Sequence, residues 1–227
     1  MSLNNRNARK IVFDLETVSL QDVANYLDAP KPKGNLKDPV KIAADLEEKR
    51  IEQLETASLD PDLCRIVALG WVEEGFDEPV VCLARTAEEE AGMLHAFWLS
   101  LDGRNTVGYN SLGFDLPILM RRSLYLGVPC PMLNLDKYRS PHVDLQQHLS
   151  HRGLLKYRSL NWYCRRFGLD VPEDATTGSD IAALVAAGKW DAVKAHCQAD
   201  VLKTRALAQR LGLFQGASVL AMSEAAF

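Results

Sequence analysis

The chain has 227 residues, of which 47% are hydrophobic and 25% charged, a composition that excludes a disordered, fibrous or membrane-embedded protein. Its formal net charge of −4 excludes binding of nucleic acid through a global positive field, although it permits a local basic groove. The longest apolar runs, such as RIVALGWV, are too short to span a bilayer, and the first ten residues lack the apolar segment of a secretion signal. We therefore expect a cytoplasmic protein that is not bound to a membrane.

The first part of the chain predicts strands and one helix. Four runs rich in β-branched and aromatic residues have the composition of buried strands: RKIVFDLE, CRIVALGWVE, PVVCLA and NTVGYN. The segment EGFDE, between the second and third runs, suits a hairpin turn. After the third run, TAEEEAGMLHAFWLSL predicts a helix with Thr86 at its N-cap and acidic residues in the first turn.

The remainder of the chain predicts helices. DLPILMRRSLYLG follows the fourth strand with helical spacing, and further helices are expected near 142–151, 159–168, 179–187 and 189–212. Strands first, then a largely helical C-terminal half, indicate an α/β fold. Because no linker or change of composition divides the chain, we expect a single domain over residues 1–227.

A long polar insertion interrupts this pattern at about residues 21–60. Its first half is rich in Pro, Lys and Gly, and DPVKIAADLEEKRIEQLETA then predicts an exposed amphipathic helix. An insertion of this length between core strands is more often functional than idle. We expect an arm beside the entrance to the active site, whose lysines contact a phosphate backbone: Lys31, Lys33, Lys37 and Lys41.

Four acidic residues and one histidine form the candidate catalytic set. Asp14 and Glu16 lie two residues apart at the end of a predicted strand, so the alternation of side chains directs both to one face. Asp115 lies at the start of a helix, and His196 precedes Asp200 by one helical turn. Each has a structural explanation when taken alone, as a solvated strand end, a first-turn acid or a surface pair. Adjacent acids on one face, such as Asp14 and Glu16, are oxygen ligands of the kind that Mg²⁺ or Mn²⁺ prefers. The joint occurrence of all four acids in this order is hard to assign to chance.

Three motifs in this order, FDLET, GYNSLGFD and HCQADVLKT, resemble the DEDD superfamily of 3′–5′ exonucleases, which share the ribonuclease H-like fold. VGYNSLGFDLPIL followed by SLNWYCRRFGL is most similar to stand-alone exonucleases related to the proofreading domain of family B DNA polymerases. The resemblance implies a mixed five-stranded sheet flanked by helices. It also implies that Asp14, Glu16, Asp115 and Asp200 bind two divalent cations, Mg²⁺ or Mn²⁺, which clamp an in-line displacement at phosphorus.

The resemblance further suggests substrate-binding residues. Leu15 would pack on the terminal base, Thr17 would lie near the 3′ hydroxyl, and Asn110 would support the strand near the metals. A basic and aromatic segment that includes Tyr157 and Arg158 would supply backbone contacts and stacking surfaces for a single strand. The alternatives are that Leu15 belongs to the core and that Asn110 closes a turn.

The third motif departs from both branches of the superfamily. One branch has tyrosine four residues before the last aspartate and the other has histidine five before it, whereas this chain has His196 four before Asp200. A neutral imidazole is a better base near pH 7 than a phenol. His196 is therefore a candidate general base, with a water-orienting group and a plain helix residue as the alternatives.

The favoured function is a metal-dependent 3′–5′ exonuclease that acts on DNA, preferably single-stranded, in proofreading or processing. An exoribonuclease of the same fold is one alternative, because sugar selectivity depends on contacts to a 2′ hydroxyl. A nucleic-acid-binding module that has lost turnover is the other, supported by the altered third motif alone. The expected partner is nucleic acid, and the sequence identifies no replication or repair partner.

Overall fold

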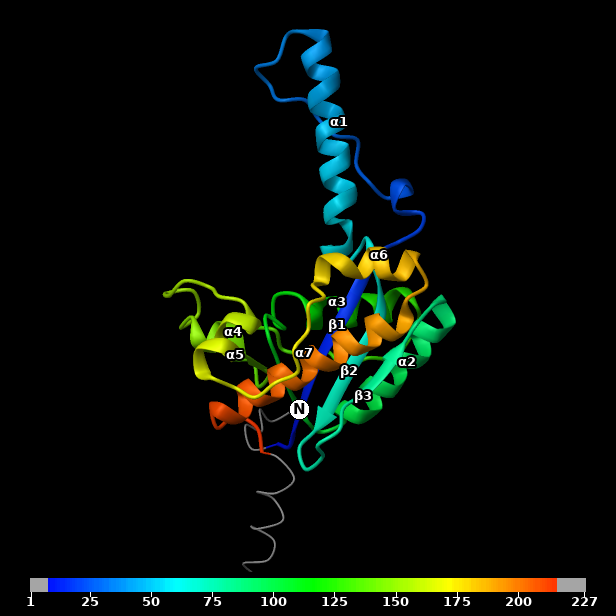
Figure 1. The fold of residues 1–227 in the computed structure, drawn as a ribbon. Coiled ribbons are helices and arrows are strands. Elements are labelled where there is room, and N and C mark those ends of the chain that lie inside the picture. Colours follow the sequence, from blue (N-terminus) through cyan, green and yellow to red (C-terminus); the bar gives the residue numbers. More distant parts are fainter. Residues whose placement is uncertain (1–7, 216–227) are drawn as a thin grey trace, which may run out of the picture.

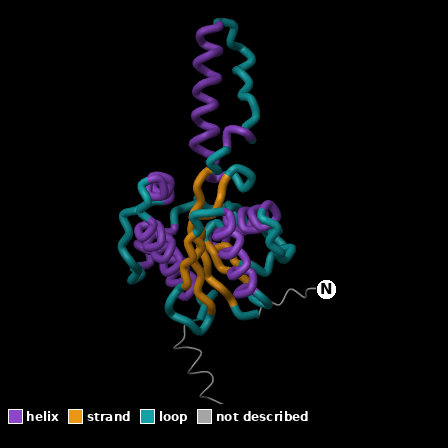
Figure 2. Tube along the Cα trace, turned by 90° about the vertical axis from the view of Figure 1, so that its right-hand side faces the viewer, coloured by secondary structure: helices purple, strands orange, loops and turns teal. Residues whose placement is uncertain are grey.

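The protein is described from a computed structural model over residues 8–215. Its centre is a five-stranded sheet in the order β3-β2-β1-β4-β5, with helices on both faces (Figure 1, Figure 2). β1 pairs antiparallel with β2 and parallel with β4, so the sheet is mixed. The strands are β1 (Lys10–Ser19), β2 (Cys64–Glu73), β3 (Val80–Leu83), β4 (Asn105–Gly108) and β5 (Val143–Asp144). The expected mixed five-stranded sheet flanked by helices is confirmed.

The alternating side chains of β1 separate two cores. Ile11, Phe13 and Leu15 pack with helices α2 and α3 on one face, whereas Val12 packs with α7 on the other. The helices are α1 (Pro39–Thr56), α2 (Ala87–Leu101), α3 (Asp115–Tyr125), α4 (Leu145–Leu149), α5 (Leu160–Phe167), α6 (Ile181–Ala186) and α7 (Trp190–Arg210). Even-numbered residues of β1 therefore point toward α7.

β5 was not predicted, and the helix expected from residue 142 begins later. Val143 and Asp144 pair with β4 as a two-residue strand. Helix α4 starts at Leu145 because the Asp144 side chain accepts hydrogen bonds from the backbone N–H groups of Gln146 and Gln147. A strand this short gives no alternation that sequence patterns could detect.

Helix α7 lies unusually close to the sheet. A Cβ atom placed on Gly70 would come within 2.9 Å of Val201 Cγ2 and 3.1 Å of Cys197 Sγ, so glycine is needed where α7 crosses β2. Gly70 pairs with Asp14 on β1. Helix α7 thus approaches the sheet closely beside Asp14, the first candidate metal ligand.

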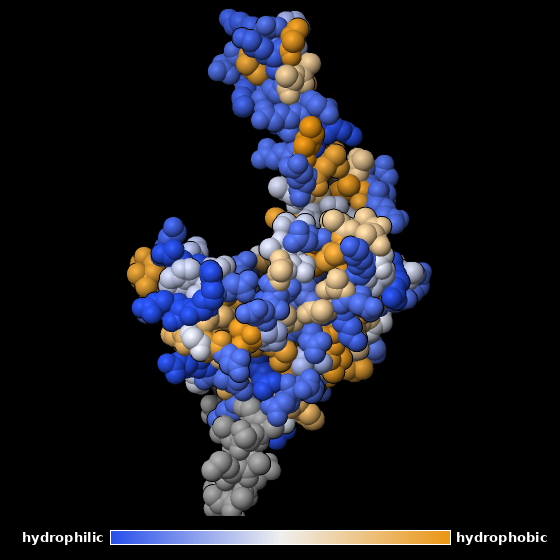
Figure 3. Space-filling model, viewed as in Figure 1, coloured by the Kyte–Doolittle hydropathy of each residue, from blue (hydrophilic) through white to orange (hydrophobic). Residues whose placement is uncertain are grey.

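The insertion forms an arm that stands away from the sheet (Figure 1, Figure 2). Helix α1 begins after Asp38, whose side chain accepts a hydrogen bond from the Val40 N–H, with Pro39 at the first helical position, as the sequence predicts. The visible surface of the arm is mostly hydrophilic, with small apolar patches (Figure 3). At its base, Thr17 Oγ1 donates to the Ser58 carbonyl at 2.6 Å. The arm therefore leaves the sheet at the end of β1 that carries Glu16.

No helix within residues 8–215 combines the length and the apolarity that crossing a membrane requires. The expected absence of a secretion signal depends on the first ten residues of the chain. Residues 1–7 of that segment lie outside the described range.

Candidate active site

β1 and α7 bring most of the acidic set together. Asp14 and Glu16 project from the face of β1 that α7 covers, and the Cys197 thiol of α7 donates to the Asp14 carbonyl at 3.7 Å. His196 and Asp200 lie on the same helix, with His196 Nε2 3.4 Å from Glu16 Oε1 and 3.9 Å from Asp200 Oδ2. The alternation of β1 and the helical spacing of α7 therefore meet at one place, as the sequence predicts.

Asp115 reaches the site from the opposite layer. It is the first residue of α3, directly after the turn that follows β4, and is 5% exposed. That turn is held by Asp144, whose carboxylate accepts hydrogen bonds from the backbone N–H groups of Asn110 at 3.0 Å and Leu112 at 3.1 Å. Sequence analysis did not identify Asp144, which has no motif around it. Asp144 caps α4 and also fixes the turn that precedes Asp115.

The acidic side chains share one electrostatic field. Removal from water, followed by the charges of Glu16, Asp115 and Asp200, raises the pKa of Asp14 well above its ordinary value. Burial, followed by Asp200 and Asp115, does the same to Glu16. Burial also raises the pKa of Asp115 to about 7. The metal-free fold therefore disfavours the ionised forms of these carboxylates, which a bound cation would stabilise.

The residues present fit a divalent cation. Glu16, His196 and Asp200 each place one ligand atom within 4.8 Å of the others. Asp14 and Asp115 add two carboxylates: the charge of Asp115 acts on both Asp14 and Glu16, and that of Glu16 acts on Asp14. A set dominated by carboxylate oxygens suits Mg²⁺ or Mn²⁺. Asp14, Glu16, Asp115 and Asp200 are the residues that would hold such ions.

A buried lysine accompanies the acids. Lys203, 3% exposed and one turn beyond Asp200, donates to Asp200 Oδ1 at 2.7 Å. Its charge lowers the pKa of Asp14 and Glu16, against the larger upward effects of burial and the neighbouring acids. Lys203 thus offsets part of the negative charge. Its spacing from Asp200 was a usable signal that sequence analysis did not use.

His196 is held by a second residue that sequence analysis missed. Its Nδ1 is hydrogen-bonded to Asp174, from the segment between α5 and α6, and its Nε2 faces Glu16 and Asp200. The histidine is 4% exposed. No regular pattern surrounds Asp174, so only the folded chain reveals this pair.

Three of the predicted substrate-binding residues have structural partners. Leu15 is 5% exposed and packs in the core on the α2–α3 face, opposite the acids. Thr17 is bonded to the base of the arm. Asn110 has a φ of 62° in the turn before Asp115, a left-handed conformation that asparagine tolerates. Their contacts with a nucleotide stay predictions.

Tyr157 and Arg158 lie outside the acidic cluster. The Tyr157 hydroxyl accepts a hydrogen bond from Gln147 Nε2 at 3.4 Å, and the Arg158 guanidinium lies over the Trp162 ring, 4.9 Å from its centroid. The Arg158 carbonyl accepts a hydrogen bond from the Tyr109 hydroxyl. These contacts order the segment between α4 and α5 and leave Tyr157 46% exposed.

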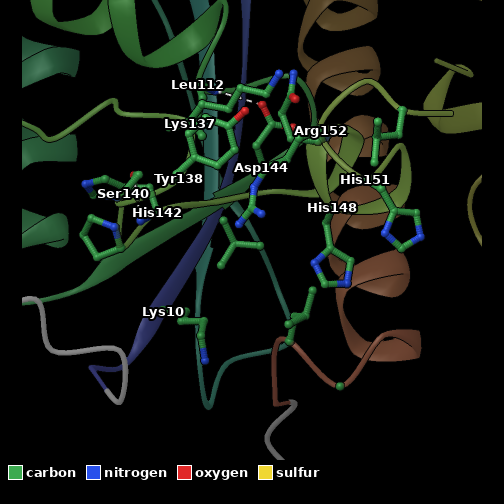
Figure 4. A pocket seen from close by; sticks show the side chains of 16 residues that line it. Lys10, Leu112, Lys137, Tyr138, Ser140, His142, Asp144, His148, His151 and Arg152 are labelled. Carbon is green, nitrogen blue, oxygen red and sulfur yellow. Dashed lines mark hydrogen bonds between the residues drawn. The ribbon is translucent and has the colours of Figure 1, made fainter. Parts of the chain in front are cut away.

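A cavity of about 710 Å³ lies beside β5 (Figure 4). It is lined by basic and aromatic side chains from several segments, including Lys10, Lys137, Tyr138, His148 and Arg152. The Arg152 guanidinium lies 5.0 Å from the centroid of the Tyr138 ring. We call this cavity the β5 groove.

Comparison with protein families matches residues 58–224 to a family described as a predicted 3′–5′ exonuclease related to the exonuclease domain of PolB. The chain belongs to this family. The matched segment contains Asp115, His196 and Asp200 but begins after Asp14 and Glu16. The assignment of those two acids to the site of this family member therefore rests on the motif in β1 and on the fold.

Two relatives extend the comparison. An uncharacterized protein of Methanocaldococcus jannaschii is 36% identical over 141 residues, which cover 60% of this chain and 75% of that protein. The family B DNA polymerase from the hyperthermophilic archaeon Pyrobaculum calidifontis matches with a TM-score of 0.59 and 20% identity over 90% of this chain. This chain spans 24% of that polymerase chain, and the likeness supports the fold alone.

The raised pKa values predict how the metal-free protein responds to pH. A carboxyl whose folded pKa exceeds its unfolded value, such as Asp115 at about 7, retains its proton in the fold after the unfolded chain has lost it. Its contribution to the free energy of unfolding therefore falls as pH rises from about 4 toward 7. We expect a lower melting temperature in EDTA at pH 8 than at pH 6, and a larger increase on adding Mn²⁺ at pH 8.

Thermal denaturation of wild type and Asp14→Asn at the two pH values measures this effect. Neutralising Asp14 should raise the metal-free melting temperature at pH 8 and reduce the Mn²⁺-induced increase. If pH and Mn²⁺ change the melting temperatures of wild type and variant equally, the charge of Asp14 does not couple stability to pH or to metal binding.

Proposed function

We propose that the protein is a metal-dependent exonuclease that hydrolyses phosphodiester bonds from the 3′ end of DNA, with single strands preferred. The observation that carries this proposal is the convergence of Asp14, Glu16, Asp115 and Asp200 from three elements into one cluster. Burial raises the pKa of Asp14, Glu16 and Asp115, and the neighbouring acids add to the rise at Asp14 and Glu16. Such a cluster is costly in a metal-free fold, and carboxylates at this density are the ligands that two divalent cations require. Membership of the exonuclease family supports the same chemistry.

The protein's own residues have separable roles in this reaction. When bound, the cations would activate the attacking water and stabilise the leaving 3′ oxygen. The four carboxylates hold the ions, and Lys203 fixes the Asp200 carboxylate through its hydrogen bond. His196 presents Nε2 to the space beside Glu16 and Asp200, where a water molecule that attacks phosphorus would be oriented.

The β5 groove is a candidate path for the strand that leads into the site. Asp144 lines the groove, and the same carboxylate holds the Asn110 and Leu112 N–H groups of the turn before Asp115. Lys137 and Arg152 stand at the end of the groove that contains Asp144 (Figure 4). Cations next to an active site are placed to contact the phosphates upstream of the 3′ end.

Charge reversal in the groove should weaken binding of a single strand. We expect Lys137→Glu with Arg152→Glu to reduce affinity by about 10-fold or more at low salt, because two phosphate contacts are lost. The dependence of log affinity on log salt should become shallower by about 0.7 per lost contact. Fluorescence anisotropy of 5′-labelled single-stranded DNA, in the Asp14→Asn background to prevent cleavage, measures both quantities.

Two further charge reversals show whether the loss of affinity arises in the β5 groove. Lys194→Glu changes an exposed lysine on the outer side of α7 and should leave the salt slope unchanged. Lys37→Glu with Lys41→Glu tests the arm, where Lys33 is already paired with Asp45 at 3.2 Å. An effect of the arm pair that equals or exceeds that of the groove pair would place the strand along the arm instead.

The proposed function is tested by nucleotide release from uniformly labelled DNA and RNA of the same sequence, single-stranded and duplex, with Mg²⁺ or Mn²⁺. We expect single-stranded DNA to yield acid-soluble nucleotides fastest, and EDTA to stop the reaction. Faster release from RNA would show that RNA, and not DNA, is the preferred substrate. If the protein binds both polymers but releases nucleotides from neither, it is a nucleic-acid-binding module without turnover.

A further inference from the structure

Asp174 and His196 form a hydrogen-bonded pair directed at the acidic cluster. His196 Nδ1 is bonded to Asp174, and the opposite ring nitrogen, Nε2, lies 3.4 Å from Glu16 Oε1 and 3.9 Å from Asp200 Oδ2. The His196 side chain is 5% exposed and that of Asp174 is 13% exposed. The ring therefore has little room to turn, and each nitrogen has a defined neighbour.

We propose that Asp174 is the positioning residue for His196, fixing the ring so that the Nε2 lone pair accepts a proton from the water that attacks phosphorus. The proposal rests on the exonuclease function proposed above and assigns it a proton acceptor. It also selects one of the alternatives that the sequence leaves open for His196, because a plain helix residue needs no carboxylate partner for its ring.

The tautomer follows from the hydrogen bond. A carboxylate only accepts, so Nδ1 must carry the hydrogen that lies between it and Asp174. In the neutral ring the lone pair is then on Nε2. A lone pair facing the carboxylate oxygens of Glu16 and Asp200 is unfavourable unless a donor or a cation lies between them. A water molecule whose O–H donates to Nε2 satisfies this requirement.

The loop that carries Asp174 holds it in this orientation. The Thr176 N–H donates to Asp174 Oδ1 at 2.9 Å, while Oδ2 is bonded to His196. Partial burial raises the pKa of Asp174, but its hydrogen bonds with His196 and Thr176 outweigh this, and the pKa lies below its ordinary value. The carboxyl is therefore ionised and available to stabilise a protonated imidazole.

The proton balance is as follows. The water oxygen forms a bond to phosphorus, its proton passes to His196 Nε2, and the bond between phosphorus and the leaving 3′ oxygen breaks. The leaving oxygen takes a proton from solvent, which gives a nucleoside 5′-monophosphate and a strand shorter by one nucleotide. The imidazolium, stabilised by Asp174, then returns its proton to solvent. Asp174 itself gains no proton.

Asp174→Asn is the informative substitution. The amide oxygen can still accept from the Thr176 N–H, so the loop keeps its hydrogen bond. The amide NH₂ then faces Nδ1 as a donor, which moves the ring hydrogen to Nε2. We expect kcat to fall by about 10- to 100-fold with little change in KM, the range typical when the partner that orients a functional histidine is removed.

A double-mutant cycle with His196→Ala separates positioning from a general effect. In the His196→Ala background Asp174→Asn should cause no further loss, because Asp174 acts through the ring. Glu173→Gln is the matched control, since it removes the charge of an exposed neighbour in the same loop, and it should leave kcat unchanged. Equal losses from Asp174→Asn with and without His196 would overturn the proposal.

Imidazole ¹⁵N–¹H NMR of the metal-free protein gives a readout that does not depend on activity. In wild type, at a pH where the ring is neutral, the hydrogen of His196 should reside on Nδ1, and in Asp174→Asn it should reside on Nε2. The signal is assigned by its absence in His196→Ala. The same tautomer in both proteins would overturn the proposal, whereas an inactive wild type with the expected tautomers would overturn only the exonuclease function.

Discussion

Asp14→Asn and Asp200→Asn should each reduce digestion of single-stranded DNA by at least about 10³-fold while the protein stays folded. Each substitution removes a ligand from the proposed cation pair and leaves a side chain of nearly the same volume, so the core is not opened. Neutralising Asp14 also removes its repulsion with Glu16, Asp115 and Asp200, which contributes to the raised pKa of Asp14. Rates from a labelled strand, together with thermal denaturation, measure both consequences.

Asp191→Asn is the matched control, because Asp191 is an exposed acid at the start of the same helix that carries Asp200. It should retain the wild-type rate. Retention of more than a few per cent of the wild-type rate in both Asp14→Asn and Asp200→Asn, with unchanged Mn²⁺ binding, is incompatible with two cations held by the four carboxylates.

His196→Ala should lower kcat by about 10²- to 10⁴-fold with little change in KM, since the proposed proton acceptor is lost and strand binding is not. His196→Tyr places at this position the residue that one branch of the superfamily carries there. Because a phenol is a poor acceptor near pH 7 and loses the bond to Asp174, we expect tyrosine not to restore turnover. Single-turnover rates of the two variants and wild type measure the effect.

Near-normal turnover in His196→Tyr would show that orienting the water suffices and that proton transfer to His196 is unnecessary. Full turnover in His196→Ala would mean that the histidine only packs beside a metal ligand. In both cases the carboxylate site remains, but the assignment of His196 and Asp174 fails.

The acidic set was predictable because each member has a regular local context. Alternation places Asp14 and Glu16 on one face of β1, helical spacing places His196 beside Asp200, and a strand followed by a helix places Asp115 at a helix start. These rules relate side chains to their own element. The motif resemblance supplied the remaining step, that the three elements meet.

Asp174, Asp144 and Lys203 were not predicted, for different physical reasons. Asp174 lies in an irregular segment, and its partner is 22 residues away in the sequence. Asp144 is the second residue of a two-residue strand, which is too short to show a pattern. Lys203 is one helical turn from Asp200 and was detectable, but a lysine beside an acid on a helix is commonly a solvated pair.

The arm was predictable as an element that follows the first strand, but the direction in which it leaves the sheet was not. Asp38 and Pro39 identify the start of α1, but nothing in residues 21–60 states the direction in which the helix leaves the sheet. That direction is set at the root, where the β1–β2 register shifts between Glu16 and Thr17 and Thr17 bonds to Ser58. A bulge next to a candidate metal ligand is a feature of pairing that only the folded sheet shows.

The most direct measurement is a time course of a 5′-labelled single-stranded DNA oligonucleotide resolved by length, with Mn²⁺, with EDTA, and with Asp14→Asn in Mn²⁺. The account predicts a ladder of progressively shorter labelled products in Mn²⁺ alone, and an intact oligonucleotide in the other two reactions. Immediate release of a labelled mononucleotide, internal cuts without a ladder, or the same ladder in EDTA would contradict it.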